Sequence, residues 1–309
     1  MFLTLKRLYA FIRLGRPIFL IGGFVMHGLG VAIALSSGAT LDLAALLWGQ
    51  IAISAIQWMT HYANDYFDLD ADRANRTPTN WSGGSRVLAE SRLAPHVALV
   101  TALIFAAVAV IAALILTFVV HTGNLTLLLI ALALILAWFY SAPPIRLHSR
   151  GLGELTTAIL VPTLVPLTGY YLQSGRLELL PLLAIFPLAC LQFCMLLSIE
   201  FPDEMSDRAV HKGTLVVRLG TKRAAKLYIA VLLLAYLSLP LLMIAGLPRL
   251  AALAIALMSP LALWQVWRIR HGDIFRPQHW DQFAFFSVAL LIGTAFVELL
   301  AFVALIGLR

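Results

Sequence analysis

Apolar runs of about 20 residues recur along the whole chain, and they constrain its fold more than any other feature. A helix needs about 20 apolar residues to cross the hydrocarbon core of a bilayer. Only 12% of the 309 residues are charged, against about 25% in a typical soluble domain. The sequence therefore predicts one all-α, polytopic membrane domain over residues 1–309, with nine spans near residues 17–35, 45–63, 96–120, 124–141, 153–173, 178–199, 225–246, 250–268 and 283–307.

The positively charged residues fall almost entirely on one side of this topology. With nine spans, the N-terminus shares a side with the loops after the second, fourth, sixth and eighth spans. These segments carry 19 of the 22 Lys and Arg residues. Because cytoplasmic loops are enriched in Lys and Arg, we expect an integral, multi-pass protein of the cytoplasmic membrane with a cytoplasmic N-terminus. This topology also accounts for the net charge of +7, and we expect no nucleic-acid partner.

Two acidic segments are related by a constant offset of 135 residues. Residues 64–79, NDYFDLDADRANRTPT, align with residues 199–214, IEFPDEMSDRAVHKGT, and five of the sixteen positions are identical. Both segments follow an even-numbered span, so both lie on the predicted cytoplasmic side. Internal repeats in membrane proteins commonly place a polar site where the two halves meet. The repeat therefore predicts that the two acidic segments form one site.

The acids in both segments have the spacing of a helix face. They stand at i, i+3 and i+7, as Asp65, Asp68 and Asp72 in the first segment and Glu200, Asp203 and Asp207 in the second. Asp70 points to another face. Carboxylates this close repel one another unless cations neutralise them, and their oxygens suit Mg²⁺ or Mn²⁺. Basic residues beside the acids suit a phosphate-bearing ligand of the metal: Arg73, Arg76, Arg86, Arg208, Lys212 and Arg218.

Two other interpretations of these segments remain at this point. The acids and bases of two solvated loops can simply cancel, although the duplicated spacing favours a metal and diphosphate site. Alternatively, intramembrane carboxylates can line a divalent-cation or proton-coupled transporter. A transporter is expected to carry acids in the middle of its spans, and only Glu298 has such a position. The acids at the predicted helix ends therefore favour an enzyme.

Several motifs resemble those of the UbiA superfamily of intramembrane prenyltransferases. NDYFDLDAD, from residue 64, is similar to the family's Asn-Asp-x-x-Asp-x-x-x-Asp signature, and DEMSD, residues 203–207, is similar to its second Asp-x-x-x-Asp motif. HKGTLVVRLG, YSAPPIRL (residues 140–147) and LGRP (residues 14–17) resemble three further family motifs. The resemblance implies nine helices around a central cavity. It also implies Mg²⁺-dependent transfer of a prenyl chain from an isoprenoid diphosphate to an acceptor.

The resemblance also implies roles for individual residues. One metal ion is expected to be held by Asn64, Asp65, Asp68 and Asp72, another by Asp203 and Asp207, and the diphosphate by Lys212, Arg73 and Arg218. Of these residues, Asp68, Asp203 and Lys212 are the expected catalytic ones. Arg86, beside the first motif, is a further candidate for binding the anionic substrate.

Prenyl transfer places further demands on the site. An allylic cation must be kept from water, which an apolar cavity does, and the prenyl tail needs a groove open to membrane lipid. Four aromatic residues near the motifs are candidates to shield the cation by cation–π contact: Tyr66, Phe67, Tyr140 and Phe201. Each of them can equally belong to an interfacial aromatic belt or to core packing.

The loop at residues 80–88, NWSGGSRVL, bears on the identity of the acceptor. The 4-hydroxybenzoate and haem branches tend to have Arg-Pro-Leu there, and this glycine-bearing loop looks more like the 1,4-dihydroxy-2-naphthoate (menaquinone-pathway) branch. We therefore expect that aromatic acceptor, with 4-hydroxybenzoate, homogentisate, a tetrapyrrole or a glycerol-phosphate lipid as alternatives. Glu200 departs from the family pattern, because many members have asparagine at that position. Candidate bases toward a ring hydroxyl are His61, Glu154 and Tyr140.

Overall fold

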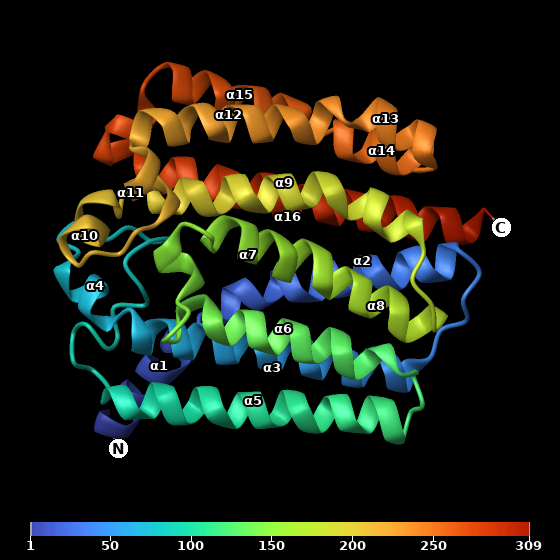
Figure 1. Cartoon of the computed structure of the whole chain (residues 1–309), viewed down its shortest axis with the longest axis horizontal. Coiled ribbons are helices and arrows are strands. Elements are labelled where there is room, and N and C mark those ends of the chain that lie inside the picture. The colour runs from blue at the N-terminus through green and yellow to red at the C-terminus, as the bar shows by residue number, and fades with distance from the viewer. Residues whose placement is uncertain (1, 309) are drawn as a thin grey trace.

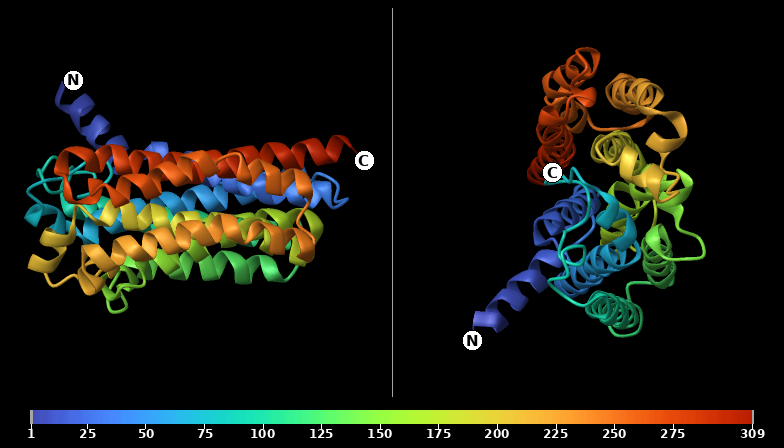
Figure 2. Two further views of the ribbon diagram at one scale, coloured as in Figure 1. Left: turned by 90° about the horizontal axis from the view of Figure 1, so that it is seen from above. Right: turned by 90° about the vertical axis from the view of Figure 1, so that its left-hand side faces the viewer.

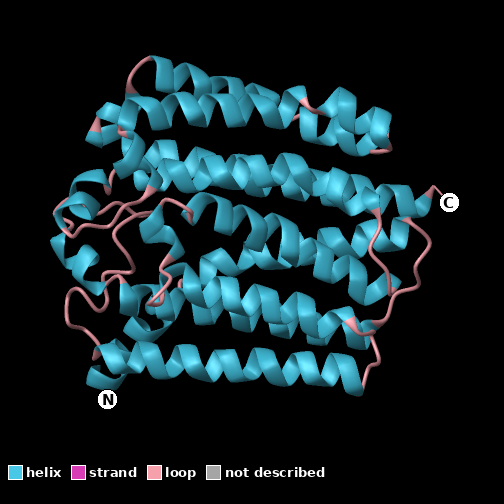
Figure 3. Cartoon of the chain, in the orientation of Figure 1, coloured by secondary structure: helices cyan, strands magenta, loops and turns pink. Residues whose placement is uncertain are grey.

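The computed structural model describes residues 2–308 and consists of helices and loops over that range (Figure 3). The long helices lie side by side along one axis (Figure 1). In chain order the elements are α1 (Phe2–Leu14), η1 (Pro17–Phe19), α2 (Leu20–Ser36), α3 (Leu43–Phe67), α4 (Leu69–Ala74), α5 (Pro95–Phe118), α6 (Leu125–Ser141), η2 (Leu147–Arg150), α7 (Gly153–Ile159), η3 (Leu160–Leu164), α8 (Val165–Ser174), α9 (Leu179–Glu200), α10 (Glu204–Ala209), α11 (Leu215–Leu219), α12 (Thr221–Leu237), α13 (Leu239–Ala245), α14 (Arg249–Ala256), α15 (Ser259–Arg270), η4 (Asp273–Phe275) and α16 (Pro277–Gly307).

Within residues 2–308, helices stand at all nine positions where the sequence predicts a span. Seven helical segments in this range are long and apolar enough to cross a bilayer, and the bent pair α12 and α13 makes eight. The remaining predicted span is α6, which is apolar but only 17 residues long. α5 ends at Phe118 and α6 begins at Leu125, so the predicted separation of two helices near residues 121–124 is confirmed.

Three of the predicted spans are interrupted, and proline accompanies each break. Pro162 lies in the π-helical turn η3 between α7 and α8, and Pro166 opens α8. Pro240 follows the 40° bend between α12 and α13, and Pro260 lies at the start of α15. Proline has no amide hydrogen and its ring collides with the preceding helical turn. The apolar pattern thus marks the span, and the prolines mark where it bends.

Large apolar side chains cover the outside of the bundle. On α5, Leu103, Ile104 and Ile111 are each more than half exposed, and on α13 Ile244 is 84% exposed. A water-soluble monomer rarely exposes contiguous apolar surface of this extent, whereas lipid tails accommodate it. Together with the spanning helices, this surface identifies an integral, multi-pass membrane protein. α1 projects away from the rest of the helices, as both views in Figure 2 show.

Each acidic segment ends a long helix and begins a short one. α3 is followed by the six-residue α4, and α9 by the six-residue α10. The bounds of α4, residues 69 and 74, correspond to those of α10, residues 204 and 209, at the offset of 135 that relates the two sequences. The two short helices lie together at one end of the bundle, on the left in Figure 1. The sequence repeat is thus matched by a repeat in secondary structure.

The breaks between these helices correct one expectation. The three acids of each segment were expected to share one continuous helix face. Instead, Asp68 lies between α3 and α4 with φ −95° and ψ 6°, and Asp203 lies between α9 and α10. In the second segment Pro202 contributes to the break, because it has no amide hydrogen to continue the helix. The helix is thus interrupted at or before the middle acid in both copies, although the amides of Asp68 and Asp72 still donate to the carbonyls of Asn64 and Asp68 across the first interruption.

Candidate active site

Both acidic segments open into one pocket at the end of the bundle where α4 and α10 lie. The pocket has about 530 Å³ of free volume, part of which is open to solvent. It is bounded by the turn before α2, both acidic segments, the glycine-bearing loop and the segment around the end of α6. Its lining residues are Arg16, Asn64, Asp68, Asp72, Trp81, Ser82, Gly83, Gly84, Tyr140, His148, Leu196, Ile199, Glu200, Asp203, Asp207, Lys212 and Thr214.

Asp68, in the first acidic segment, is in direct contact with Lys212 of the second. Lys212 Nζ lies 3.0 Å from one of its oxygens and His148 Nε2 lies 2.7 Å from the other. Asn64 donates a further hydrogen bond of 3.0 Å. Burial would raise the pKa of Asp68, but Lys212 and His148 together hold this pKa well below its usual range. Asp68 is therefore an ionised carboxylate held between the Lys212 ammonium group and the His148 ring.

Lys212 connects the first motif to the second. Its Nζ atom is 3.0 Å from Asp68 and 3.7 Å from Asp207. Burial would lower the pKa of Lys212, but these two carboxylates raise it well above its usual value. Lys212 is thus a permanent cation, placed in the pocket between the motifs. Two of the three predicted catalytic residues, Asp68 and Lys212, are in direct contact, and the third, Asp203, lines the same pocket.

Asp65 lies in the last turns of α3, behind the pocket wall, and is 1% exposed. It forms an ion pair with Arg16 and accepts hydrogen bonds from the hydroxyl and, at 3.2 Å, from the amide of Ser85. Arg16 belongs to the LGRP motif, so the opening motif and the first acidic motif are joined directly. The contact also holds the glycine-bearing loop against α3.

Two other acids lie close to negative charges that their neighbours do not fully neutralise. Burial raises the pKa of Asp72 to about 8, and the charges of Asp65 and Asp68 add to the effect. Burial also raises the pKa of Asp203 to about 6, with the charge of Asp207 contributing. Like charges held close together disfavour ionisation. A further cation at this site would relieve that repulsion.

The donor set of the pocket fits Mg²⁺. It offers the carboxylates of Asp68, Asp72, Asp203 and Asp207 and the amide of Asn64, whereas Asp65 lies outside the lining. Mg²⁺ takes oxygen ligands of this kind. Across residues 2–308, no three His, Cys, Asp or Glu side chains already stand in metal-binding geometry. Some of the acids are bound by side chains of the protein instead. Arg16 forms an ion pair with Asp65, and the amide of Asn75 donates a hydrogen bond of 2.8 Å to Asp203. The raised pKa values of Asp72 and Asp203 are what a bound divalent cation would reverse.

The glycine-bearing loop closes over the acids through its backbone. The amide of Gly83 lies 3.3 Å from a carboxylate oxygen of Asp203. Gly84 has φ +72°, and a Cβ atom there would lie 1.9 Å from Oδ2 of Asp72. The two glycines therefore permit an approach of main chain to carboxylate that a side chain would block.

Gly84→Ala is expected to reduce prenyl transfer at least about tenfold, because Asp72 must move to admit the methyl group. Gly220→Ala is the matched control. Gly220 has φ +75°, and nothing lies within 4 Å of the position of its Cβ. Both variants place an alanine at a positive φ, but only the first brings a methyl group against Asp72, so only the first should lose activity beyond its loss of thermal stability. Equal activity in the two variants would show that the position of Asp72 is unimportant.

The remaining predicted residues lie at different places. Arg73 and Arg218 are exposed and do not line the pocket; Nε of Arg218 donates to the carbonyl of Gly213 at 2.9 Å. Arg86 is bonded to the backbone carbonyl of Asp72 and is outside the pocket lining as well. A role for these three arginines in binding diphosphate stays a prediction.

Of the four aromatic candidates, Tyr140 lines the pocket. Tyr66 and Phe67 pack edge to face with each other at 5.0 Å between ring centroids. Phe201 packs 6.3 Å from Phe283. Of the four candidates, Tyr140 is therefore the one placed to meet a substrate, and its ring also packs 5.1 Å from that of His148.

The sequence-based selection did not include several residues of the site. Arg16, Ser85, Asn75 and His148 all contact a motif acid. His148 directly follows the YSAPPIRL segment, and its Nδ1 faces the carbonyl of Tyr140 at 2.6 Å. Each of these residues stands within or beside a recognised motif. That proximity was the only signal available, because their partners are distant in sequence.

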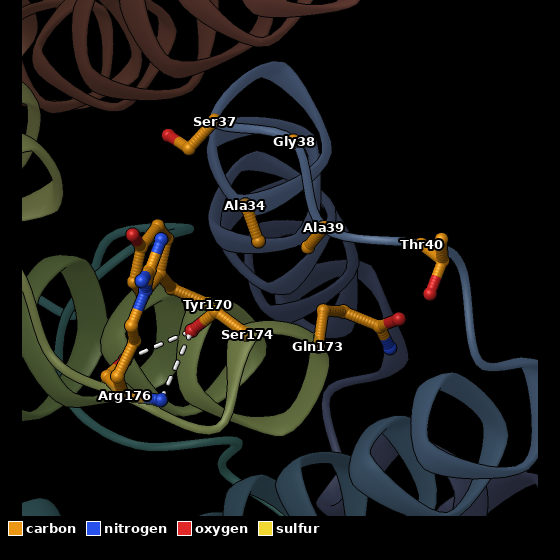
Figure 4. Close-up of a pocket in the computed structure, with 9 residues that line it drawn as sticks. All are labelled: Ala34, Ser37, Gly38, Ala39, Thr40, Tyr170, Gln173, Ser174 and Arg176. Carbon is orange, nitrogen blue, oxygen red and sulfur yellow. Dashed lines mark hydrogen bonds between the residues drawn. The ribbon is translucent and has the colours of Figure 1, made fainter.

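A second hollow lies at the opposite end of the bundle, between the α2–α3 and α8–α9 connections (Figure 4). It is lined by Ala34, Ser37, Gly38, Ala39, Thr40, Tyr170, Gln173, Ser174 and Arg176. None of these nine residues carries a carboxylate, so this hollow lacks the ligands that a Mg²⁺–diphosphate complex requires. The candidate active site is the pocket at the motif end.

Comparisons with known proteins agree with this geometry. Residues 24–291 match the UbiA prenyltransferase family. The 1,4-dihydroxy-2-naphthoate octaprenyltransferase of Mycobacterium leprae (strain TN) is 26% identical over 248 residues, which are 80% of each chain.

Two solved structures share the fold over almost the whole chain. Digeranylgeranylglyceryl phosphate synthase gives a TM-score of 0.67 at 15% identity and covers 97% of this chain and 99% of its own. A UbiA homologue from Archaeoglobus fulgidus, bound to GPP and Mg²⁺, gives a TM-score of 0.63 at 18% identity. The match covers 94% of this chain and 99% of the homologue. At these identities the likeness establishes the fold.

The family match covers well over half of the chain. It confirms the resemblance that the motifs indicate, and it confirms the prediction of an enzyme, so the transporter alternative is set aside. The chain belongs to the UbiA prenyltransferase family.

Proposed function

We propose that this prenyltransferase uses Mg²⁺ to transfer a polyprenyl group from an isoprenoid diphosphate to 1,4-dihydroxy-2-naphthoate, a step of menaquinone biosynthesis. The observation that supports the site most strongly is the position of Lys212, 3.0 Å from Asp68 of the first motif and 3.7 Å from Asp207 of the second. A single cation thus ties the two duplicated motifs to one pocket. We further propose that residues 1–309 act as one domain whose motif end faces the cytoplasm.

The acids and the lysine have different tasks in this proposal. The metal ligands would be Asn64, Asp65, Asp68 and Asp72 from the first segment and Asp203 and Asp207 from the second. The UbiA homologue bound to GPP and Mg²⁺ supports this use of the fold. Lys212, kept protonated by Asp68 and Asp207, would donate hydrogen bonds to the diphosphate oxygens.

The chemistry follows from this placement. Cleavage of the bond between the allylic carbon and the diphosphate oxygen leaves the electron pair on the diphosphate. Bound Mg²⁺ would supply positive charge that stabilises this leaving group, and Lys212 adds a preorganised donor. The allylic cation then forms a bond with a ring carbon of the acceptor. When that carbon bears the ring carboxylate, loss of CO₂ returns the electron pair to the ring.

Apolar and aromatic residues complete the pocket. Tyr140, Leu196 and Ile199 line it beside the acids, and they would shield the allylic cation from water. Tyr140 is also suited to cation–π contact. The prenyl tail would leave the pocket toward membrane lipid.

The choice of acceptor rests on two supports. Relatives at 24–26% identity are named 1,4-dihydroxy-2-naphthoate octaprenyltransferase, and the glycine-bearing loop lies directly over the acids. The structure named digeranylgeranylglyceryl phosphate synthase shares only 15% identity, so it supports the fold and not its own acceptor.

The test is an assay of the purified, detergent-solubilised chain with geranylgeranyl or octaprenyl diphosphate and a panel of acceptors. The expected product carries the prenyl group in place of the carboxylate of the naphthoate. It should form with Mg²⁺, and EDTA should abolish its formation. Product from 4-hydroxybenzoate, homogentisate or a glycerol-phosphate lipid, with none from the naphthoate, would replace the acceptor in this proposal. Diphosphate turnover that continues in EDTA would reject the metal site.

The apparent affinity for Mg²⁺ should rise with pH between about 6 and 8. Asp72, with its pKa raised to about 8, and Asp203, with its pKa raised to about 6, bind protons at the lower end of this range. A metal ion must displace those protons. For each proton displaced, the apparent affinity for Mg²⁺ falls up to about tenfold for every unit by which the pH is lowered. Titration of activity with Mg²⁺ at several pH values measures the effect. A pH-independent Mg²⁺ requirement would show that these acids are not ligands.

A further inference from the structure

Two glutamates beside the pocket are unused by the metal and diphosphate chemistry. Glu154 lies in the first turn of α7 and is 1% exposed, and Glu200 is the last residue of α9 and is 8% exposed. Both carboxyl oxygens of Glu154 and Oε2 of Glu200 are buried, and within residues 2–308 none of the three has a hydrogen-bond partner. Buried polar atoms are nearly always hydrogen-bonded, so such atoms at a pocket indicate a missing ligand.

The two side chains form a pair. α7 and α9 pack against each other, which brings the two carboxyl groups close enough to interact. Glu200 faces the pocket, where its neighbours in the lining are Tyr140, Leu196 and Ile199. Glu154 lies behind it and is not part of the lining. An acidic pair therefore stands beside the most apolar part of the wall.

The internal repeat shows that this arrangement is particular to the second copy. At the offset of 135, Glu200 corresponds to Asp65. Asp65 is satisfied by Arg16 and by two hydrogen bonds from Ser85. No cation pairs with Glu200 among the ion pairs of the described residues, and Lys212 pairs with Asp68 and Asp207 instead. Oε2 of Glu200 thus remains able to accept a hydrogen bond, whereas the oxygens of Asp65 already accept hydrogen bonds.

We propose that Glu200, held in position by Glu154, accepts a hydrogen bond from a hydroxyl group of the aromatic acceptor. A hydroxyl group is the donor that the free carboxyl oxygens lack, and Tyr140, Leu196 and Ile199 offer the apolar surface that a ring needs. The pair thereby orients the hydroxyl side of the ring toward α7 and α9. This inference rests on the proposed function and deepens it, because it assigns the selection of a hydroxylated acceptor to Glu200 and the support of Glu200 to Glu154.

The experiment compares Glu200→Gln and Glu154→Gln with the wild type, using 1,4-dihydroxy-2-naphthoate and 1-hydroxy-2-naphthoate as acceptor probes. A site built to bind a hydroxyl group discriminates strongly against an analogue that lacks it. In both variants the KM for the dihydroxy acceptor should rise about tenfold, while the KM for the prenyl diphosphate changes less than about twofold. The preference for the dihydroxy over the monohydroxy probe should shrink in the same proportion.

Glu298→Gln is the matched control. Glu298 lies in α16, is 0% exposed, and neither of its carboxyl oxygens has a partner in the described range, yet it lies outside the pocket lining. It tests the general effect of neutralising a buried glutamate, and its KM values should equal those of the wild type. Glu154→Asp, which retains the carboxyl group, should recover part of the acceptor affinity that Glu154→Gln loses.

The outcomes separate this inference from the proposed function. Equal rises in the KM values for acceptor and diphosphate, or an unchanged preference between the two probes, would overturn the role of the glutamates. If the wild type itself forms no product from the naphthoate, the choice of acceptor fails instead. The variants are then compared on the acceptor that the panel identifies, together with its analogue lacking one hydroxyl, and an unchanged preference there overturns the inference.

Discussion

Asp68→Asn is expected to lower kcat for prenyl transfer about a thousandfold. Asp68 lies 3.0 Å from Lys212 and 2.7 Å from His148, and it belongs to the proposed metal ligands. Asparagine has nearly the same shape but no charge, so the metal loses an anionic ligand and Lys212 loses the nearer of its two counter-charges. Release of radiolabelled or fluorescent prenyl product from saturating substrates measures the effect.

Asp70→Asn provides the control for this substitution. Asp70 lies two residues away in the same motif, but its side chain is exposed and does not line the pocket. The same change in charge at this position should alter kcat less than about twofold, since screened surface charges interact weakly. Comparable losses in both variants would mean that the charge of the segment matters and not the ligand geometry. High added Mg²⁺ should not restore Asp68→Asn, because the ligand itself is missing.

Lys212→Met should lower kcat/KM for the prenyl diphosphate about a hundredfold or more. Methionine keeps much of the length of the side chain and removes its charge. The buried ion pair with Asp68 is broken at the same time, which should also lower stability by about 3 kcal/mol. Thermal unfolding in detergent separates the two effects, because activity is assayed well below the unfolding temperature of the variant.

Lys222→Met removes the same charge from an exposed position at the start of α12. It should leave kcat/KM for the prenyl diphosphate and the thermal stability unchanged. Lys212→Arg should retain part of the diphosphate affinity, since it keeps the positive charge but changes the geometry of the donors. If Lys212→Met bound the diphosphate as tightly as the wild type, Lys212 would be a structural residue that only joins Asp68 and Asp207.

The apolar pattern was sufficient to locate the membrane helices. Leu- and Ala-rich segments place helices at all nine predicted positions within residues 2–308, because length and hydrophobicity alone select segments for a bilayer. The duplicated acids at Asp68 and Asp203 likewise indicated one shared site. Both signals are local or periodic, so a single sequence carries them.

The same reasoning did not locate the interruptions of the two helices. It placed the three acids of each segment on one helix face, whereas the chain turns at Asp68 and at Asp203. The spacing of acids describes an uninterrupted helix, and it says nothing of where that helix stops. Of the acids, Asp68 from the first copy and Asp207 from the second contact Lys212.

The sequence by itself thus determined the membrane class, the positions of the helices, the repeated acidic motifs and the family. Tertiary structure alone decided the pairings within the site: Arg16 with Asp65, His148 with Asp68, Asn75 with Asp203, and Glu154 with Glu200. These partners are 46 to 128 residues apart in sequence, and no periodicity links them. They meet because helix packing brings distant loops to one end of the bundle. There NDYFDLDAD, which as a sequence is only an acidic segment after an apolar run, becomes one wall of a pocket.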